Sequence, residues 1–419
     1  MNIEQLYQLY TKNYLVDTDT RKIRKGSIFF ALKGDNFNGN KFAADALKSG
    51  ASYAVIDEVE YHTSPNTILV ENVLSTLQQL ANFHRKQLTF PIISLTGSNG
   101  KTTTKELINA VLSKKYKTTA TIGNLNNHIG VPLTLLSMTP KTEIGIVEMG
   151  ANHLKEIEFL CSIAAPNFGL ITNFGKAHLE GFGSSDGVIK GKSELYVFLR
   201  SSNGTVFINT DDELQVKQSS GINTIAFNGT QIKFVEANPF VKIEFKNIII
   251  ESNLIGKYNY SNIMVAIAIG NYFKIPENDI KNAIESYIPS NNRSQLLQKG
   301  TNKIILDAYN ANPSSMQAAL ENFSQLKDTN KIVFLGDMFE LGEESKTEHQ
   351  KIANLVTSYS FSKVFLIGKA FSTTRVKNAF VSESYESFKN STNYSNINNA
   401  TILIKGSRGM ALERLLDLL

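Results

Sequence analysis

The sequence lacks the features that mark secreted, zinc-binding and membrane proteins. Its single cysteine, Cys161, excludes an internal disulfide framework and a zinc site built from several cysteines. No apolar run approaches the ~18 residues that a membrane-spanning helix needs. The first ten residues lack the basic-then-apolar order of a secretory signal. These absences predict a soluble, cytoplasmic protein with no membrane insertion.

The sequence also lacks a large excess of either positive or negative charge. The chain has 43 Lys and Arg residues against 38 Asp and Glu residues, a formal net charge of +5 at pH 7. This surplus suits an anionic substrate, but the basic residues are scattered, so we expect no nucleic-acid partner. With 42% hydrophobic and 19% charged residues, the composition is that of a globular protein. At roughly 100–200 residues per domain, a chain of 419 residues predicts two to four domains.

The pattern of apolar runs predicts an α/β protein of three parts. Residues 1–88 are mixed, with short strand-like runs and one stretch of helical spacing. In residues 89–290, short apolar runs predict a parallel sheet, and closely spaced runs between about 204 and 252 predict antiparallel hairpins appended to it. In residues 291–419, strands and helices alternate again, which predicts a second, Rossmann-like parallel sheet because parallel strands need crossovers.

Some local predictions follow from the same pattern. The appended hairpins would begin with the runs Thr205–Ile208 and Thr224–Phe227. The hinge between the second and third parts would be Asn291–Arg293, shortly after Pro289. The segment Arg408–Leu418 has the spacing of a last helix.

The sharpest motif is a glycine-rich turn after the predicted strand Ile92–Leu95 and before a helix predicted from Thr103. Glycines let backbone N–H groups point at phosphate oxygens, and the start of a helix adds positive potential. Lys101 would reach the β- and γ-phosphate oxygens, and the Thr102 hydroxyl would ligate Mg²⁺. Leu95 stands where the standard phosphate loop has its first glycine, and a glycine turn with a surface lysine is the alternative interpretation. The predicted ATP-binding stretch is Thr96, Gly97, Ser98, Asn99, Gly100, Lys101, Thr102 and Thr103.

Glu148 ends another predicted strand, 46 residues after Thr102 in the chain. A carboxylate at the carboxyl edge of a strand, beside a phosphate loop, is where a Mg²⁺ ligand is needed. An ordinary turn carboxylate is an equally open interpretation from position alone.

The order of these motifs resembles the Mur ligase family and its folylpolyglutamate synthase relatives, whose nucleotide loop also lacks the first glycine. The matching motifs are Thr96–Thr104, Asn124–Pro132, Glu148–Gly150, Asn173–Gly183 and Gly191–Glu194. Three segments near the start of the chain resemble the family's uridine-nucleotide domain: Asp19–Arg21, Gly26–Leu32 and Gly50–Ala51. Two further motifs resemble one branch of the family, the ligase that adds D-alanyl-D-alanine to UDP-N-acetylmuramoyl-tripeptide: Asp307–Pro313 and Lys405–Met410.

The resemblance implies an ATP-dependent, ADP-forming ligase that works through an acyl phosphate in peptidoglycan precursor synthesis. ATP and Mg²⁺ would be its cofactors, and the UDP-linked tripeptide and the dipeptide its partners. Residues 1–88 would bind the UDP substrate, 89–290 ATP, and 291–419 the dipeptide. The family also suggests a monomer.

Roles for single residues follow from the same resemblance. Thr102 and Glu148 would ligate Mg²⁺. Lys192 falls where the family carries a lysine carbamylated by CO₂, and His178 where a histidine helps to bind a second Mg²⁺; with Lys101 they would be the catalytic residues. From the residues alone, Lys192 is a solvated helix lysine and His178 a loop histidine.

Further contacts are implied on both sides of the reaction. Asn259 and Asn262 match asparagines on the adenine side, although a helix N-cap at Asn259 is equally open. Arg293 and Asp307 match residues that close on the nucleotide. Substrate contacts are expected from Thr20, Arg21, Ser27, Asn127, Tyr309, Asn310, Asn312, Lys405, Ser407 and Arg408.

Departures from the family pattern and alternative interpretations leave some of these residue roles open. Asn38 and Asn40 stand where the uridine domain usually has Asp and His, so the uridine contacts are open. Asn310 and Asn312 can also be turn residues before a proline. The nearest rival is a sister Mur ligase or a folylpolyglutamate synthase-like ligase that adds a single amino acid, and the Asp307–Pro313 motif argues against both. A P-loop switch or motor ATPase would need a switch loop and a partner surface, and nothing in the sequence indicates either. The set of potential metal ligands argues against a non-catalytic nucleotide-binding module.

Overall fold

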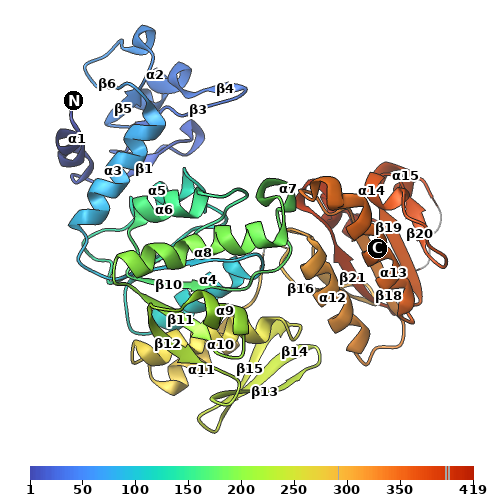
Figure 1. Cartoon of the computed structure of the whole chain (residues 1–419). Helices are drawn as coiled ribbons and strands as arrows, with labels where there is room; N and C mark the ends of the chain where they lie inside the picture. The colour runs from blue at the N-terminus through green and yellow to red at the C-terminus, as the bar shows by residue number, and fades with distance from the viewer. Residues whose placement is uncertain (291, 392–393, 395–396) are drawn as a thin grey trace.

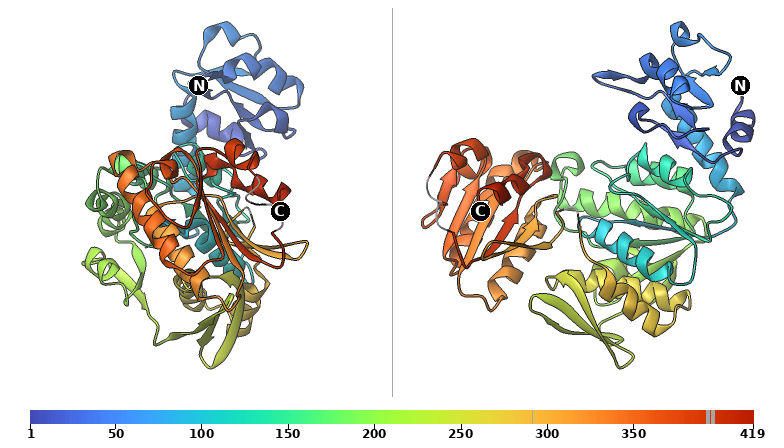
Figure 2. Two further views of the ribbon diagram at one scale, coloured as in Figure 1. Left: turned by 90° about the vertical axis from the view of Figure 1, so that its right-hand side faces the viewer. Right: turned by 180° about the vertical axis from the view of Figure 1, so that it is seen from behind.

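The computed structural model describes residues 1–290, 292–391, 394 and 397–419 and shows three α/β domains in chain order (Figure 1). The central domain lies between the other two, and the views from the side and from behind in Figure 2 show the N-terminal and C-terminal domains on different sides of it. Residue 291, where the predicted hinge and third domain begin, lies outside the described residues. In the described part of the chain, no helix has both the length and the apolar character that crossing a membrane requires.

The N-terminal domain is a four-stranded parallel sheet with helices and a small hairpin around it. Its strands lie in the order β1 (Val16–Asp17), β2 (Ile28–Phe30), β5 (Tyr53–Ile56) and β6 (Thr67–Leu69). The hairpin is β3 (Lys33–Gly34) and β4 (Phe37–Asn38), and the helices are α1 (Ile3–Tyr10), α2 (Ala43–Lys48) and α3 (Val73–Gln87). Short 3₁₀ turns occupy Thr20–Lys22, Gly39–Phe42 and Val59–Tyr61.

The central domain is built on a six-stranded parallel sheet. The order across the sheet is β12 (Asn223–Phe227), β11 (Thr205–Asn209), β10 (Phe168–Ile171), β7 (Ile92–Thr96), β9 (Ile144–Glu148) and β8 (Thr118–Ala120). An antiparallel sheet of β13 (Ile232–Ala237), β14 (Phe240–Phe245) and β15 (Ile248–Ile255) is appended to it. The helices are α4 (Lys101–Leu112), α5 (Gly130–Leu135), α6 (Glu156–Ala164), α7 (Leu179–Phe182), α8 (Ser185–Ser201), α9 (Glu213–Gln218), α10 (Asn259–Tyr272) and α11 (Glu277–Ser286).

The appended antiparallel sheet is smaller than the sequence predicts. The runs assigned to its first hairpin are β11 and β12, and they pair in parallel, with Val206 opposite Thr224. Parallel neighbours need a crossover, and α9 supplies it. This helix of six residues is too short to stand out as a periodic pattern, which is why the prediction of a hairpin here is wrong.

The C-terminal domain is a second mostly parallel sheet. Its order is β16 (Gln295–Lys299), β17 (Asn302–Asp307), β21 (Thr401–Lys405), β18 (Lys331–Gly336), β19 (Lys363–Ile367) and β20 (Phe380–Ser382), with β16 antiparallel. The helices are α12 (Pro313–Gln325), α13 (Ser345–Ser358), α14 (Lys369–Ser372) and α15 (Tyr385–Lys389). The last predicted helix, Arg408–Leu418, is wrong. Two 3₁₀ turns, Arg408–Met410 and Leu412–Asp417, replace it because Ala411 between them has a left-handed backbone, with φ +48°.

Both faces of the central sheet are covered. Side chains alternate along a strand, so Ile93 and Leu95 of β7 join one apolar cluster with α4 and α10, while Ile92 joins the cluster on the other face. With both faces closed, a ligand reaches this sheet at its carboxyl edge, where the loops leave the strands.

A buried arginine fixes α3 to the start of the central sheet. The guanidinium of Arg85 donates to the carbonyl of Ala164 at 2.9 Å and to Oδ1 of Asn167 at 2.9 Å. The same Asn167 oxygen accepts the N–H of Ile92, the first residue of β7, at 2.9 Å. The arginine is 7% exposed and Ala164 is fully buried, so removing the guanidinium would leave the carbonyl of Ala164 without this donor in a buried place.

We therefore expect Arg85→Met to lower the free energy of unfolding by roughly 2–4 kcal/mol, the cost of stranding buried acceptors. The measurement is urea unfolding followed by circular dichroism. Lys86→Met at the exposed neighbouring position is the matched control. Equal stability of the two variants would contradict the anchoring role.

Candidate active site

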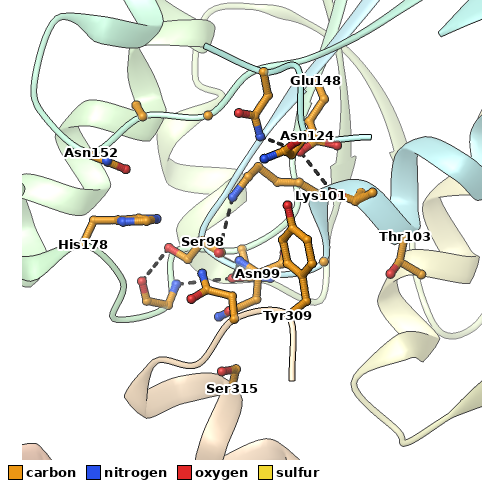
Figure 3. Close-up of a pocket in the computed structure, with 18 of the residues that line it drawn as sticks. Ser98, Asn99, Lys101, Thr103, Asn124, Glu148, Asn152, His178, Tyr309 and Ser315 are labelled. Carbon is orange, nitrogen blue, oxygen red and sulfur yellow. Dashed lines mark hydrogen bonds between the residues drawn. The ribbon is translucent and has the colours of Figure 1, made fainter. Parts of the chain in front are cut away.

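A cavity of about 1000 Å³ opens at the carboxyl edge of the central sheet, and residues of all three domains line it. Figure 3 shows how lining residues of the central and C-terminal domains lie around it. Gln78 comes from α3, the phosphate loop and Glu148 from the central domain, and Tyr309 and Lys405 from the C-terminal domain. The arrangement therefore brings together residues that are far apart in the sequence. Most of the predicted nucleotide and metal residues line the cavity: Ser98, Asn99, Gly100, Lys101, Thr102, Thr103, Glu148, His178, Asn259, Asn262, Arg293 and Asp307.

The phosphate loop has the conformation that its glycines permit. Gly97 and Gly100 have φ values of +141° and +79°, which side-chain-bearing residues rarely adopt. A Cβ at Gly100 would also lie 2.6 Å from Oδ1 of Asn262. Helix α4 begins at Lys101, two residues before the predicted start, so Lys101 itself stands in the first turn, where backbone N–H groups are free to bind an anion.

Lys101 points across its own loop. Its Nζ donates to the carbonyl of Gly97 at 2.7 Å and to that of Ser98 at 3.5 Å, the second of which Figure 3 shows. Burial lowers the pKa of Lys101, and the carboxylate of Glu148 acts in the opposite direction. An anionic phosphate beside the amine would strengthen its positive charge, so the site favours a ligand that brings negative charge.

A buried carboxylate sits next to the loop. Glu148 is 1% exposed, and its Oε1 accepts Thr102 Oγ1 at 3.2 Å and Asn126 Nδ2 at 2.8 Å. Its Oε2 is buried, and no residue in the described part of the chain hydrogen-bonds it. A buried anionic oxygen without a donor is costly, and a cation offsets that cost. The oxygen donors of Thr102 and Glu148 therefore fit Mg²⁺, and the turn-carboxylate interpretation of Glu148 does not explain its burial.

Most of the coordination of such an ion would have to come from elsewhere. Within the described ranges, no group of three or more His, Cys, Asp or Glu side chains could hold a metal ion. Mg²⁺ commonly keeps several waters and takes phosphate oxygens beside one or two protein ligands, so this sparse donor set is consistent with an ion that arrives with a nucleotide.

Lys192 is a buried amine. It lies on α8 with 0% exposure, and Nζ donates to the carbonyl of Ala151 at 3.0 Å. Its Nζ also lies 4.9 Å from the ring centroid of Phe182. Burial first, and the nearby charge of Lys101 second, hold the pKa of Lys192 well below its usual value. The interpretation of Lys192 as a solvated helix lysine is therefore wrong, and its environment favours the neutral, nucleophilic amine.

His178 points into the cavity from a left-handed backbone position just before α7 (Figure 3). Its Nδ1 contacts Oε2 of Glu340, a residue of the C-terminal domain. This contact lowers the pKa of the Glu340 carboxyl. His178 is thus not an isolated loop histidine, because it joins two domains.

The two asparagines of α10 connect that helix to the phosphate loop. Asn262 Nδ2 donates to Asn259 Oδ1 at 2.8 Å, and Asn262 Oδ1 accepts Thr104 Oγ1 at 3.0 Å. Asn259 Nδ2 donates to the carbonyl of Ile255 at 2.8 Å. Tyr258, not Asn259, occupies the N-cap of α10, so the N-cap interpretation of Asn259 is wrong.

The C-terminal domain presents a charged and polar face to the phosphate loop. The Arg293 guanidinium stacks 3.7 Å from the ring centroid of Tyr309, and Lys405, 2% exposed, pairs with Asp307 at 2.5 Å. Asn312 donates to Oδ1 of Asn99 in the phosphate loop at 2.8 Å. Its own Oδ1 also caps α12, so the turn role and the contact with the loop coexist in Asn312. Asn310 lines the cavity.

Other predicted substrate residues lie outside this cavity. Ser407 accepts the N–H of Phe339 at 2.9 Å, and Arg408 pairs with Glu413 at 2.5 Å, so both are occupied within their own domain. Thr20, Arg21 and Ser27 belong to the N-terminal domain and do not line the cavity. Of the central-domain residues, Asn127 lines it while its Oδ1 accepts the N–H of Gly130 at 2.9 Å. Thr96 and Lys192 stand behind the lining residues, Thr96 with 0% exposure.

The segment with Asn38 and Asn40, where the uridine domain usually has Asp and His, is held by amides. Asn40 is fully buried, its Oδ1 accepts the N–H of Asp57 at 2.9 Å, and its Nδ2 donates to Oδ1 of Asp57 at 2.9 Å. Asn38 Nδ2 donates to Glu58 at 2.8 Å. These amides therefore fasten the turn after β4 to the end of β5.

Two residues with direct contacts to predicted site residues were not themselves predicted from the sequence. Asn126 supports Glu148, and Glu340 contacts His178. Asn126 lies inside a motif that resembles the family, so the motif itself was the available signal. Glu340 follows the carboxyl end of β18, the edge where ligand-binding loops gather in such sheets, and that position could have singled it out.

The geometry predicts that Gly100→Ala weakens ADP binding about tenfold or more, because a left-handed alanine costs roughly 1–2 kcal/mol and its Cβ would collide with Asn262. Calorimetric titration with ADP and Mg²⁺ measures this change. Gly123→Ala is the control, since Gly123 has φ +56° but open space around its Cβ. A Gly100→Ala variant that bound ADP like the control would show that the loop does not hold the phosphates.

Three family models match successive parts of the chain. They are described as "Mur ligase family, catalytic domain" over residues 13–90, "Mur ligase middle domain" over 95–270 and "Mur ligase, glutamate ligase domain" over 292–408. The matched ranges follow the three domains of the structure.

Similar proteins cover nearly the whole chain. The UDP-N-acetylmuramoyl-tripeptide–D-alanyl-D-alanine ligase of Bacillus subtilis (strain 168) is 35% identical over 96% of this chain and 92% of its own length. That of Escherichia coli (strain K12) is 32% identical over 95% and 92%. Among solved structures, MurF from Acinetobacter baumannii matches with a TM-score of 0.85 at 26% identity, over 99% of this chain and 97% of the other. The MurF ligase from Thermotoga maritima in complex with ADP matches with a TM-score of 0.84 at 25% identity, over 98% and 97%. Because the family models match most of the chain and the B. subtilis and E. coli relatives are more than 30% identical over nearly all of it, the chain belongs to the Mur ligase family.

Proposed function

We propose that this chain joins D-alanyl-D-alanine to UDP-N-acetylmuramoyl-tripeptide, with conversion of ATP to ADP and phosphate, in the synthesis of peptidoglycan precursors. The names of the B. subtilis and E. coli relatives support the two substrates, and the ADP complex of the T. maritima ligase supports the nucleotide. The observation that carries the proposal is that the phosphate loop, the buried Glu148 and the C-terminal residues Asp307, Asn310 and Lys405 share one cavity.

The chemistry requires this proximity. A carboxylate and an amine do not condense until the carboxylate is activated, and transfer of the γ-phosphoryl group to the tripeptide carboxylate gives an acyl phosphate. The amine of the dipeptide then attacks the acyl carbon, and phosphate leaves. Lys101 and the loop N–H groups would lower the repulsion between the two anions in the first step. Thr102 and Glu148 would hold Mg²⁺, which when bound neutralises phosphate charge.

The three domains would divide the work. Residues 1–88 would hold the UDP part, with Thr20, Arg21 and Ser27 on that side, and Asn127 would contact the peptide. Residues 89–290 would hold ATP through Thr96–Thr103, Asn259 and Asn262, with Arg293 and Asp307 closing on it. Residues 291–419 would hold the dipeptide by Tyr309, Asn310, Asn312, Lys405, Ser407 and Arg408. Closure of the domains excludes water, which would otherwise hydrolyse the acyl phosphate.

We further propose that Lys192 carries a carbamate and that His178 helps to bind a second Mg²⁺. A neutral lysine amine adds to CO₂ and loses a proton, which converts an amine into an anionic oxygen ligand. The low pKa of Lys192 supplies the neutral amine that this reaction needs. We also propose that the protein acts in the cytoplasm as a monomer.

A phosphate-release assay tests the function directly. Release should require ATP, the UDP-tripeptide and D-alanyl-D-alanine together. A sister ligase would respond instead to a single amino acid, and an ATPase that does mechanical work would release phosphate without either peptide. Running the assay with both common UDP-tripeptides would also identify the third residue of the acceptor.

Lys101→Ala should reduce kcat by at least about 100-fold, the usual effect of removing one donor to a transition-state anion, while binding of the UDP-tripeptide stays normal. The measurements are phosphate release and calorimetric binding of the UDP-tripeptide. Lys114→Ala, at an exposed position after the same helix, is the control. Turnover near that of the control would remove Lys101 from the mechanism.

Lys192→Ala should also have low activity, but added formate or acetate should restore part of it by supplying the missing anionic oxygens. Lys190→Ala, on the exposed face of the same helix, should be fully active and insensitive to the added acids. An unimpaired Lys192→Ala, or one that no short carboxylate improves, would argue against a carbamate.

A further inference from the structure

The contact between His178 and Glu340 crosses from the central to the C-terminal domain. Glu340 lies in the loop between β18 and the 3₁₀ turn Gly342–Glu344. Its carboxylate meets Nδ1 of His178, and its carbonyl accepts the N–H of Glu180 in α7 at 3.2 Å. The glutamate is therefore held to the central domain by both its side chain and its backbone.

The loop that presents Glu340 is anchored residue by residue. The carboxylate of Asp337 accepts the N–H groups of Ala370 and Phe371 at 2.9 and 3.0 Å. Met338 donates its N–H to Nε2 of the buried His349 at 3.0 Å, and Phe339 donates its N–H to Ser407 at 2.9 Å. Three consecutive residues before Glu340 are thus fixed to three other segments of the domain, which makes the position of its carboxylate well defined.

Both partners adopt an uncommon backbone conformation. Glu340 has φ +61° and His178 has φ +53°, in the left-handed region that costs non-glycine residues free energy. Such conformations persist where the surrounding structure imposes them, and they gather at functional sites. The meeting of two such residues favours a specific task over an incidental surface ion pair.

We propose that Glu340 is a positioning residue for His178 in the ligation reaction, an inference that rests on the proposed function. Glu340 faces Nδ1 of His178 as an ion-pair contact. This contact is favourable when Nδ1 carries the ring proton, because an unprotonated nitrogen and a carboxylate oxygen, both acceptors, would repel each other. The imidazole is then held as the Nδ1–H form, and Nε2 is left with its lone pair, available as a ligand. Metal-binding histidines are commonly oriented by a carboxylate on their other nitrogen in this way.

This arrangement couples the orientation of His178 to docking of the C-terminal domain. The same interface contains the Lys176–Glu348 pair at 3.1 Å and the Asn312–Asn99 hydrogen bond at 2.8 Å. When the domain that carries the dipeptide site moves away, His178 loses its carboxylate partner. Activation of the tripeptide carboxylate is therefore favoured when the incoming amine is at hand to use the acyl phosphate.

Steady-state kinetics of Glu340→Ala test the role. We expect kcat to fall about 10–100-fold, the range for losing the carboxylate behind a ligating histidine, with unchanged KM for ATP and the UDP-tripeptide. Glu340→Gln keeps an acceptor oxygen and should recover part of the loss. Glu343→Ala, in the exposed neighbouring turn, is the matched control and should match wild type. Unchanged kcat, or a defect confined to KM for D-alanyl-D-alanine, would overturn the proposal, the latter by assigning Glu340 to the dipeptide amine.

A spectroscopic measurement separates this inference from the proposed function. The chain has six histidines, and ¹⁵N-edited NMR of the imidazoles, with His178→Gln used to identify the signals of His178, reports which nitrogen carries the proton. The wild type, recorded with ADP, Mg²⁺ and the UDP-tripeptide, should show protonated Nδ1, and Glu340→Ala should lose this preference. Identical spectra for the two proteins would reject the role of Glu340. Wild-type protein without dipeptide-dependent phosphate release would reject the function instead, whatever the spectra show.

Discussion

The buried carboxylate of Glu148 is the constraint around which the rest of the site is arranged. An anion at 1% exposure with one oxygen lacking a donor is unfavourable unless positive charge compensates it. Asn126 and Thr102 offset part of the cost through its other oxygen, and Lys101 adds a nearby positive charge. The sheet order places β9, which ends in Glu148, directly beside β7, which leads into the phosphate loop. The fold thus places the buried carboxylate of Glu148 beside the loop where a nucleotide and its cation would bind.

The contacts between the central and C-terminal domains are both polar and apolar. The polar ones include an asparagine pair, a lysine–glutamate pair and the His178–Glu340 contact. One apolar cluster also contains Leu179 and Phe182 of the central domain together with Met338 and Leu341 of the C-terminal domain. Polar contacts at a surface exchange readily with water and cost little to break, so the polar pairs add little resistance to separation of the two domains. The shared apolar cluster adds more, because separating the domains would expose apolar surface to water.

The sequence predicted those parts of the structure that depend on neighbouring residues. The phosphate loop is a local motif between a strand and a helix, so the strand, the glycine turn and the helix that follows it were predicted from spacing. The burial of Lys192 was not, because it arises where α8 packs against Ala151 and Phe182, and a lysine on a helix looks solvated until its neighbours are known. The parallel pairing of β11 and β12 was not predicted because the crossover between them is a helix of only one or two turns. The break in the last predicted helix was not predicted because it depends on a single backbone angle, at Ala411. Glu340 was missed because its partner lies in another domain.

The turn that holds Asn38 and Asn40 has a consequence for how the N-terminal domain responds to acidity. Where relatives usually place an aspartate and a histidine, this chain has two amides, and amides keep the same protonation at every pH at which the protein is folded. Histidine is the side chain that ordinarily changes charge between about pH 5 and 8. The side chains of Asn38 and Asn40 therefore contribute no change of charge to the fastening between β4 and β5 when the surrounding medium acidifies.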